Sequence, residues 1–143
     1  MPLTTPLPTG FSEQIHELLP EEAPALLRAL DEEPSVSIRL NARKTREIEL
    51  SLPLGDAVPW AKPLGYYLDQ RPSFTADPLW HAGCYYVQEA SSMLLSLVKP
   101  LVGEKPLTAL DLCAAPGGKS TLLLDLLPKG SVLVSNELIR SRA

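Results

Sequence analysis

The stretch LDLCAAPGGKS, residues 110–120, joins the end of an apolar run to a cluster of small residues. The run itself, residues 107–112, has the length of a strand, and residues 119–127, KSTLLLDLL, have the length and composition of a helix. Residues 131–135, SVLVS, are rich in β-branched side chains, which predicts a second strand. Strand, helix and strand in this order predict a βαβ unit, and therefore a parallel sheet of the α/β class.

The small residues of this stretch indicate that a ligand approaches the backbone. In a βαβ unit the loop after the first strand faces the binding crevice, and the next helix presents free N–H groups. A ligand reaches such a backbone only where side chains are absent or very small. The residues that supply this opening are Ala114, Ala115, Gly117 and Gly118, while Pro116 stiffens the turn.

Two nucleotide-binding motifs resemble the stretch without matching it. It lacks the GxGxxG of a dinucleotide fingerprint. It matches the second half of the phosphate-loop motif GxxxxGK[ST] at Gly118, Lys119 and Ser120, but Cys113 stands where that motif has its first glycine. A nucleotide-binding phosphate-loop protein is therefore kept as an alternative.

Glu137 favours a different ligand. It follows the second strand, twenty residues after Gly117, where an acidic residue meets the ribose hydroxyls of adenosine cofactors in Rossmann-like folds. A phosphate-loop enzyme has no need of a ribose-binding acid at this place. The loop and the acid together predict an adenosine cofactor without a pyrophosphate, which is S-adenosylmethionine.

The composition is that of a globular protein. The chain has 143 residues, a net charge of −4 and 45% hydrophobic residues, which suits one domain or a small domain with part of another. The acidic balance gives no bulk attraction to nucleic acid, so RNA binding needs a local patch. Two cysteines, neither in a CxxC pair, predict no disulfide framework and no zinc site. Without a long apolar run or a signal peptide, we expect no membrane partner, no metal and a cytoplasmic location.

The N-terminal part has the pattern of a small α+β domain. Residues 10–20 and 21–34 carry apolar side chains at helical spacing, which predicts two packed helices. Residues 35–41, SVSIRLN, alternate apolar and polar side chains, which predicts a half-buried strand. A change of sequence pattern then divides the chain into an N-terminal domain, residues 1–84, and the start of a second domain, residues 85–143.

The segments around this boundary are less regular. Residues 51–83 are rich in Pro and Gly and predict loops, with a short strand around Tyr66 to Leu68. Their exposed aromatic side chains could stack on bases, but buried aromatics that anchor a loop are the more common case. These aromatics are Trp60, Trp80, Tyr66 and Tyr67. Residues 85–100 predict an entry segment and a helix that ends at Pro100.

A basic cluster overlaps the end of the predicted strand at residues 35–41. Its members are Arg39, Arg43, Lys44 and Arg46. A solvated turn is one interpretation of such a cluster. In an acidic chain, however, it is the one local group of charges able to hold a phosphate backbone, so it is the candidate RNA contact.

With these motifs assembled, the chain resembles the Nop/Sun family of RNA cytosine-5 methyltransferases, in particular the bacterial ribosomal RNA enzymes of the RsmF type. LDLCAAPGGKST (110–121) is similar to the cofactor motif of that family, and YYVQEASSMLL (85–95) to the segment that enters its catalytic domain. SIRLNARK (37–44) is similar to its N-terminal RNA-associated region. The resemblance implies a Rossmann-like methyltransferase fold, of which the chain contains the first βαβ unit.

The resemblance also implies roles for individual residues. The S-adenosylmethionine site is lined by Cys113, Ala114, Ala115, Pro116, Gly117, Gly118 and Lys119, and Glu137 binds the ribose. The substrate is RNA, ribosomal RNA by this likeness. Family members attack cytosine with a cysteine on a later strand, so the resemblance assigns no catalytic residue here, and Cys84 is expected to be a small buried residue.

We therefore expect an N-terminal portion of a longer enzyme, inactive by itself, with a non-catalytic RNA-binding fragment as a further alternative. The sequence leaves the oligomeric state open.

Overall fold

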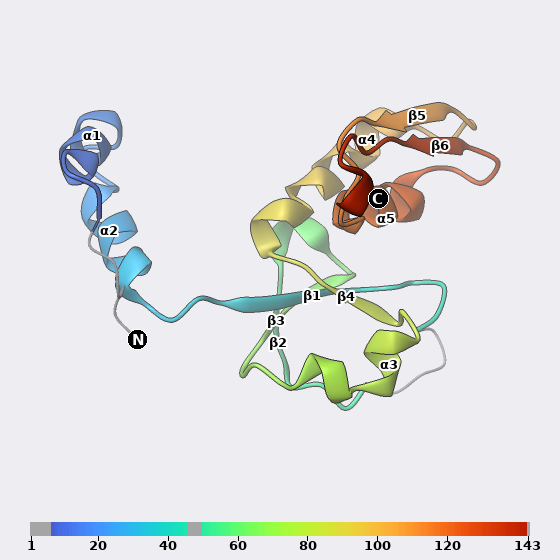
Figure 1. Ribbon diagram of the computed structural model, residues 1–143, viewed down its shortest axis with the longest axis horizontal. Coiled ribbons are helices and arrows are strands. Elements are labelled where there is room, and N and C mark those ends of the chain that lie inside the picture. The colour runs from blue at the N-terminus through green and yellow to red at the C-terminus, as the bar shows by residue number, and fades with distance from the viewer. Residues whose placement is uncertain (1–6, 46–49, 143) are drawn as a thin grey trace. The chain divides into compact units, whose positions relative to one another are not determined.

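The computed structural model describes residues 7–45 and 50–142 (Figure 1). The chain folds as two compact units, one that ends at Ser35 and one that begins at Val36. Arg46, the last member of the predicted basic cluster, lies outside the described residues. No helix in the described part of the chain is both long enough and apolar enough to cross a membrane.

The first unit contains the two predicted helices, α1 (Phe11–Leu18) and α2 (Ala23–Asp31), which contact each other. Pro24 lies in the first turn of α2, where the missing N–H group costs no intrahelical hydrogen bond. Ala23 is fully buried, and its N–H donates to the Leu19 carbonyl at 2.8 Å. The prediction of a helical pair is confirmed.

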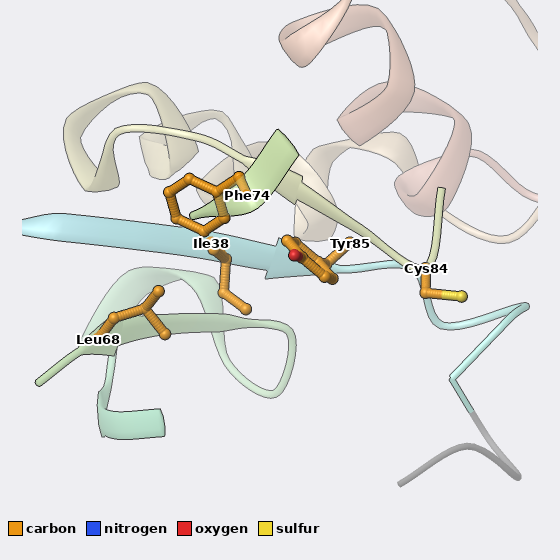
Figure 2. Packing of buried hydrophobic residues seen from close by; sticks show 5 residues of the cluster. All are labelled: Ile38, Leu68, Phe74, Cys84 and Tyr85. Atoms are coloured by element: carbon orange, nitrogen blue, oxygen red, sulfur yellow. The ribbon is translucent and has the colours of Figure 1, made fainter. Parts of the chain in front are cut away.

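The second unit begins with a four-stranded antiparallel sheet. Its order is β2-β3-β1-β4, so β1 (Val36–Leu40) is an inner strand between β3 (Gly65–Leu68) and β4 (Tyr85–Val87). The edge strand β2 (Leu54–Ala57) pairs with β3. Figure 2 shows the main core cluster around β1, which consists of Ile38, Leu68, Phe74, Cys84 and Tyr85.

Strand β1 is buried on both faces, so the prediction of a half-buried strand is wrong. Ile38 faces the apolar core, but Ser37 and Arg39 on the other face are only 4% and 3% exposed. The polar face is covered because Gln88 and the helix that follows the glycine-rich loop contact these side chains. Alternation of polar and apolar residues alone does not distinguish such a face from a solvated one.

The segment 51–83 contains more regular structure than its composition predicts. The short strand around Tyr66 to Leu68 is confirmed as part of β3. The sequence prediction missed β2, the helix α3 (Pro78–His81) and two 3₁₀ turns. The two tryptophans and the tyrosine pair of this segment are half-buried and pack against core clusters, as expected for residues that anchor loops.

The predicted helix after residue 85 is a 3₁₀-helix over Ala90–Val98, followed directly by α4 (Lys99–Val102). The helical segment therefore does not end at Pro100, contrary to the prediction. Pro100 lies in the first turn of α4, a position that needs no N–H group and favours the fixed φ of proline.

The C-terminal part of the second unit is the predicted βαβ unit. Strand β5 (Thr108–Asp111) pairs in parallel with β6 (Val132–Ser135), and α5 (Gly118–Leu126) connects them. The register joins Thr108 to Val132 and Asp111 to Ser135, so both strands end at the same edge. In Figure 1 helix α5 lies against this strand pair. The carboxyl edge is where parallel sheets bind ligands.

Candidate cofactor-binding site

The glycine-rich loop begins at Asp111, the last residue of β5. The Oδ2 atom of Asp111 accepts a hydrogen bond from the Ser120 hydroxyl at 2.6 Å, and Oδ1 accepts one from the Cys113 N–H at 3.2 Å. One carboxylate therefore joins the start of the loop to the first turn of α5. Asp111 is not among the predicted site residues, although its place at the carboxyl end of a strand was a usable signal.

The loop is also attached to the end of β6. The Ala114 N–H donates to the Asn136 carbonyl at 2.9 Å, and the Asn136 side-chain amide donates to the Leu112 carbonyl at 3.0 Å. Within the loop, the Gly117 N–H donates to the Ala114 carbonyl at 2.7 Å. These bonds fix a compact turn across the carboxyl ends of both parallel strands.

The two adjacent glycines of the loop are required for different structural reasons. Gly117 precedes α5 with a φ of +98°, and a Cβ atom added there would meet no atom within 4 Å. Its missing side chain therefore leaves open space. A Cβ added to Gly118 would lie 3.3 Å from Tyr86 Cε1 and from Gln88 Nε2. The small size of Gly118 is thus explained by packing against β4 and its continuation, which the sequence did not predict.

Glu137 lies directly beside the loop. Its Oε2 accepts a hydrogen bond from the Ala115 N–H at 3.1 Å, and its Oε1 accepts one from the Ile139 N–H at 2.9 Å. The N–H groups of Ile139 and Ala115 stabilise the ionised form and lower the pKa of Glu137 below its ordinary value. The fold thus brings together the acid and the loop that sequence spacing had associated.

The lowered pKa predicts a pH-dependent loop. Because the folded-state pKa lies below the unfolded value, the stabilisation by Glu137 is complete above the ordinary value of 4.5 and is lost as the pH falls through the lowered folded pKa. We expect the melting temperatures of the parent and Glu137→Gln to differ at pH 7 and to converge in this acidic range. Thermal melts at a series of pH values test this, and a difference that grows on acidification would contradict it.

Two concavities adjoin the loop. The larger, of about 360 Å³, is lined by Ala114, Ala115, Pro116, Gly117, Ser120, Ser135, Glu137 and Arg142. The smaller, of about 220 Å³, is lined by loop residues that include Cys113, Gly118 and Lys119, together with residues 86–89 and Ser92. The predicted site residues are therefore divided, since Gly117 and Glu137 share the larger concavity whereas Cys113 and Lys119 line the smaller one.

The basic cluster is not a uniform cationic surface. Arg39 is buried and forms an ion pair with Asp125 of α5, so the hypothesis that it contacts RNA phosphates is wrong. Arg43 and Lys44 are exposed, and they donate to the carbonyls of Leu124 at 3.2 Å and Ala82 at 2.5 Å. Only these two members of the cluster remain as candidate phosphate contacts within the described residues.

The cysteines differ in exposure. Cys84 is 2% exposed within the core, which confirms the prediction that it is a small buried residue, whereas Cys113 is exposed. Both are free thiols. Over residues 7–45 and 50–142, no three His, Cys, Asp or Glu side chains are grouped as metal ligands.

The class of protein to which the chain belongs follows from its similarity to known methyltransferases. Ribosomal RNA small subunit methyltransferase F of Escherichia coli O1:K1 / APEC is 31% identical over 152 residues, which cover 97% of this chain and 31% of that protein. A methyltransferase homologue from Pyrococcus horikoshii is 27% identical, with a TM-score of 0.71 over 95% of this chain and 46% of that one. The chain is thus a member of a methyltransferase family.

The particular family follows from the N-terminal half. Residues 7–90 match the N-terminal domain of 16S rRNA methyltransferase RsmF, and the chain belongs to this family. PH0851, whose crystal structure is known, is 22% identical in sequence and shares the fold with a TM-score of 0.75. The match covers 94% of this chain and 31% of the PH0851 chain. The present chain spans about one third of the length of the curated relatives that it matches.

Proposed function

We propose that the chain forms the cofactor-binding part of an S-adenosylmethionine-dependent methyltransferase that acts on carbon 5 of cytosine in ribosomal RNA. The loop residues Cys113 to Lys119 and the acid Glu137 form the cofactor site in this proposal. Family membership supports methyl transfer to RNA, and the motifs LDLCAAPGGKST and YYVQEASS support the choice of cytosine.

The observation that carries the proposal is the contact between Glu137 and the Ala115 N–H at the carboxyl edge of β5 and β6. Each oxygen of Glu137 accepts one backbone hydrogen bond and retains a lone pair. These lone pairs can accept hydrogen bonds from ribose hydroxyls. Gly117 lines the same concavity and leaves room for the remainder of an adenosine cofactor.

The phosphate-loop alternative is less favoured by this geometry. A triphosphate requires positive charge and free N–H groups along its length. Here the larger concavity is lined by the carboxylate of Glu137 as well as by Arg142, and Glu137 already accepts the Ala115 N–H. Cys113 in place of the first motif glycine also carries a side chain at the point where a phosphate needs bare backbone.

Calorimetry on the full-length enzyme tests the cofactor assignment. We expect one S-adenosylmethionine site per chain and no comparable heat with Mg²⁺-ATP. Incubation with ribosomal RNA, followed by mass spectrometry of the nucleosides, should detect 5-methylcytosine. Binding of ATP without S-adenosylmethionine would reverse the choice between the two hypotheses.

The proposal also assigns a role to each part of the chain. Residues 1–84 are the RNA-associated part and residues 85–143 begin the methyltransferase part. This functional division differs from the two compact units, which are divided between Ser35 and Val36, because β4 pairs with β1. No residue of this chain is assigned as the nucleophile, because Cys84 is buried and Cys113 belongs to the cofactor motif. The two free thiols agree with a reducing, cytoplasmic environment.

The exposed members of the basic cluster lead to a prediction about RNA affinity. If Arg43 and Lys44 each contact a phosphate, replacing both by Ala should flatten the log–log salt dependence of RNA affinity by roughly 1.5 units. The double variant of the exposed Lys62 and Lys105, which removes the same charge elsewhere, should leave the slope unchanged. Filter-binding titrations at several salt concentrations measure both slopes. Equal slopes for the two double variants would assign Arg43 and Lys44 to a solvated turn.

A further inference from the structure

Arg39 is a buried charge at the junction between the antiparallel sheet and α5. Its side chain extends from the inner strand β1, where its Nε donates to Gln88 Oε1 at 2.9 Å. Its Nη1 donates to the carboxylate of Asp125. The guanidinium thus joins β1 to α5 through two residues, Arg39 and Asp125, that are 86 positions apart in the sequence. Such a group has donors to spare, because a guanidinium carries five N–H bonds in a rigid fork.

The remaining donors point toward the glycine-rich loop. The Nη2 atom donates to Thr121 Oγ1 at 2.7 Å and to the Gly118 carbonyl at 3.4 Å. The Thr121 hydroxyl in turn donates to the Gly117 carbonyl at 2.8 Å. Two successive hydrogen bonds therefore connect Arg39 to the glycine that leaves open space in the larger concavity.

The neighbouring strand holds the same part of the loop. Tyr86 of β4 lies opposite Arg39 in the strand pairing. Its hydroxyl donates to the Pro116 carbonyl at 3.1 Å, and its ring adjoins the backbone of Gly118. Together, β1 and β4 contact the loop directly at Pro116 and Gly118, and β1 reaches Gly117 through Thr121.

Stability alone is a weak reason for this arrangement. Burial lowers the pKa of Arg39 and raises the pKa of Asp125, because both charges lose contact with water, and their mutual attraction opposes the two shifts. Buried ion pairs often contribute little net stability compared with apolar residues of similar size. A fixed geometry is the better-supported result of a fully hydrogen-bonded polar cluster.

We propose that Arg39 is a positioning residue for the cofactor loop: by holding the Thr121 hydroxyl it adds a second hydrogen bond to the carbonyl of Gly117, which also accepts the Thr121 N–H at 2.8 Å, so the antiparallel sheet contributes to the cofactor affinity. The link to affinity rests on the proposed function, whereas the link to loop order does not. Arg39 contacts neither cofactor nor substrate in this account and acts only through the loop. The basic residue Arg39 of β1 thus serves the cofactor site and not the RNA backbone.

Three variants of the full-length enzyme separate positioning from general stability. Arg39→Lys keeps the charge but loses the planar fork, and Thr121→Val removes the hydroxyl that connects Arg39 to Gly117. Tyr85→Phe is the matched control, because it removes a side-chain hydrogen bond to Asp77 from the same sheet without a contact to the loop. Circular dichroism should show all three folded at the working temperature.

Hydrogen exchange of peptides covering residues 113–121 is the primary measurement. We expect exchange in these peptides to accelerate about five- to tenfold in Arg39→Lys and Thr121→Val, and to stay at the parent rate in Tyr85→Phe. The dissociation constant for S-adenosylmethionine should rise about fivefold in the first two variants only.

The outcomes are distinguishable. Unchanged exchange in both loop variants, or an equal change in Tyr85→Phe, would overturn the positioning role. If Arg39→Lys does not fold, Thr121→Val decides by the same two measurements. If the parent binds no S-adenosylmethionine, the proposed function fails, and the exchange rates alone decide whether Arg39 orders the loop.

Discussion

Gly117→Val is expected to lower the affinity for S-adenosylmethionine by roughly a hundredfold or more. Gly117 has a φ of +98°, which a β-branched residue adopts only at a cost of about 1–3 kcal/mol. The new side chain would also enter the open space beside Gly117, because no protein atom lies within 4 Å of the added Cβ. Under the proposed function, this space belongs to the cofactor. Calorimetry with the full-length enzyme measures the effect.

The chain contains a matched control for this substitution. Gly103, between α4 and β5, has a φ of +70°, and a Cβ added there also meets no atom within 4 Å. With a ψ of −161°, against −4° at Gly117, Gly103 lies in a region that only glycine readily adopts, so Gly103→Val introduces a backbone strain at least as large, away from the loop. We expect both variants to melt at a lower temperature than the parent, but only Gly117→Val to lose cofactor affinity. Equal affinities for the two folded variants would remove the loop from the cofactor site.

The βαβ unit could be predicted because each of its signals is local. Strand length, helix length and β-branched composition are read within windows of five to nine residues, and the structure places β5, α5 and β6 there. The small residues of the loop were likewise visible, as was Glu137, because the spacing between a loop and the end of the next strand is set by the intervening helix.

The environment of Arg39 could not be predicted in the same way. Its alternation with apolar neighbours is the same for a solvated face and for a face covered by a helix. The difference depends on Asp125 and Thr121, which are more than eighty residues away in the sequence. For this reason a buried, hydrogen-bonded guanidinium was assigned to a basic cluster. Because Arg39 is far from the loop in the sequence, its position beside the loop in the fold could not be predicted.

The connections that shape the loop were missed for a related reason. Most are single hydrogen bonds between a side chain and a backbone group, such as Asn136 to the Leu112 carbonyl and Tyr86 to the Pro116 carbonyl. Neither side chain stands in a pattern that identifies its partner. A residue of a short strand can contact a loop without belonging to a recognisable motif. Residues 85–88 therefore contributed to the family resemblance, but their contacts with the loop could not be predicted.

Glu137→Ala is expected to weaken S-adenosylmethionine binding by roughly ten- to a hundredfold, because hydrogen bonds to a charged group are stronger than neutral ones. Two physical causes would contribute. The ribose hydroxyls would lose their acceptor, and the Ala115 N–H would lose the bond of 3.1 Å that holds the loop beside β6. Calorimetry on the alanine variant measures the combined loss of affinity from both causes and does not separate them.

A cofactor analogue separates these causes. S-adenosylmethionine that lacks the ribose 2′-hydroxyl should bind the parent less tightly than the natural cofactor, by roughly tenfold if Glu137 accepts that hydroxyl's hydrogen bond. In Glu137→Ala this discrimination should disappear, since the partner of the missing hydroxyl is itself absent. Discrimination that persists at its parental value would show that Glu137 orders the loop through Ala115 and Ile139 without contacting the ribose. The loop would then keep its place in the cofactor site. The ribose acceptor would be another group that lines the larger concavity, such as Ser135, the last residue of β6.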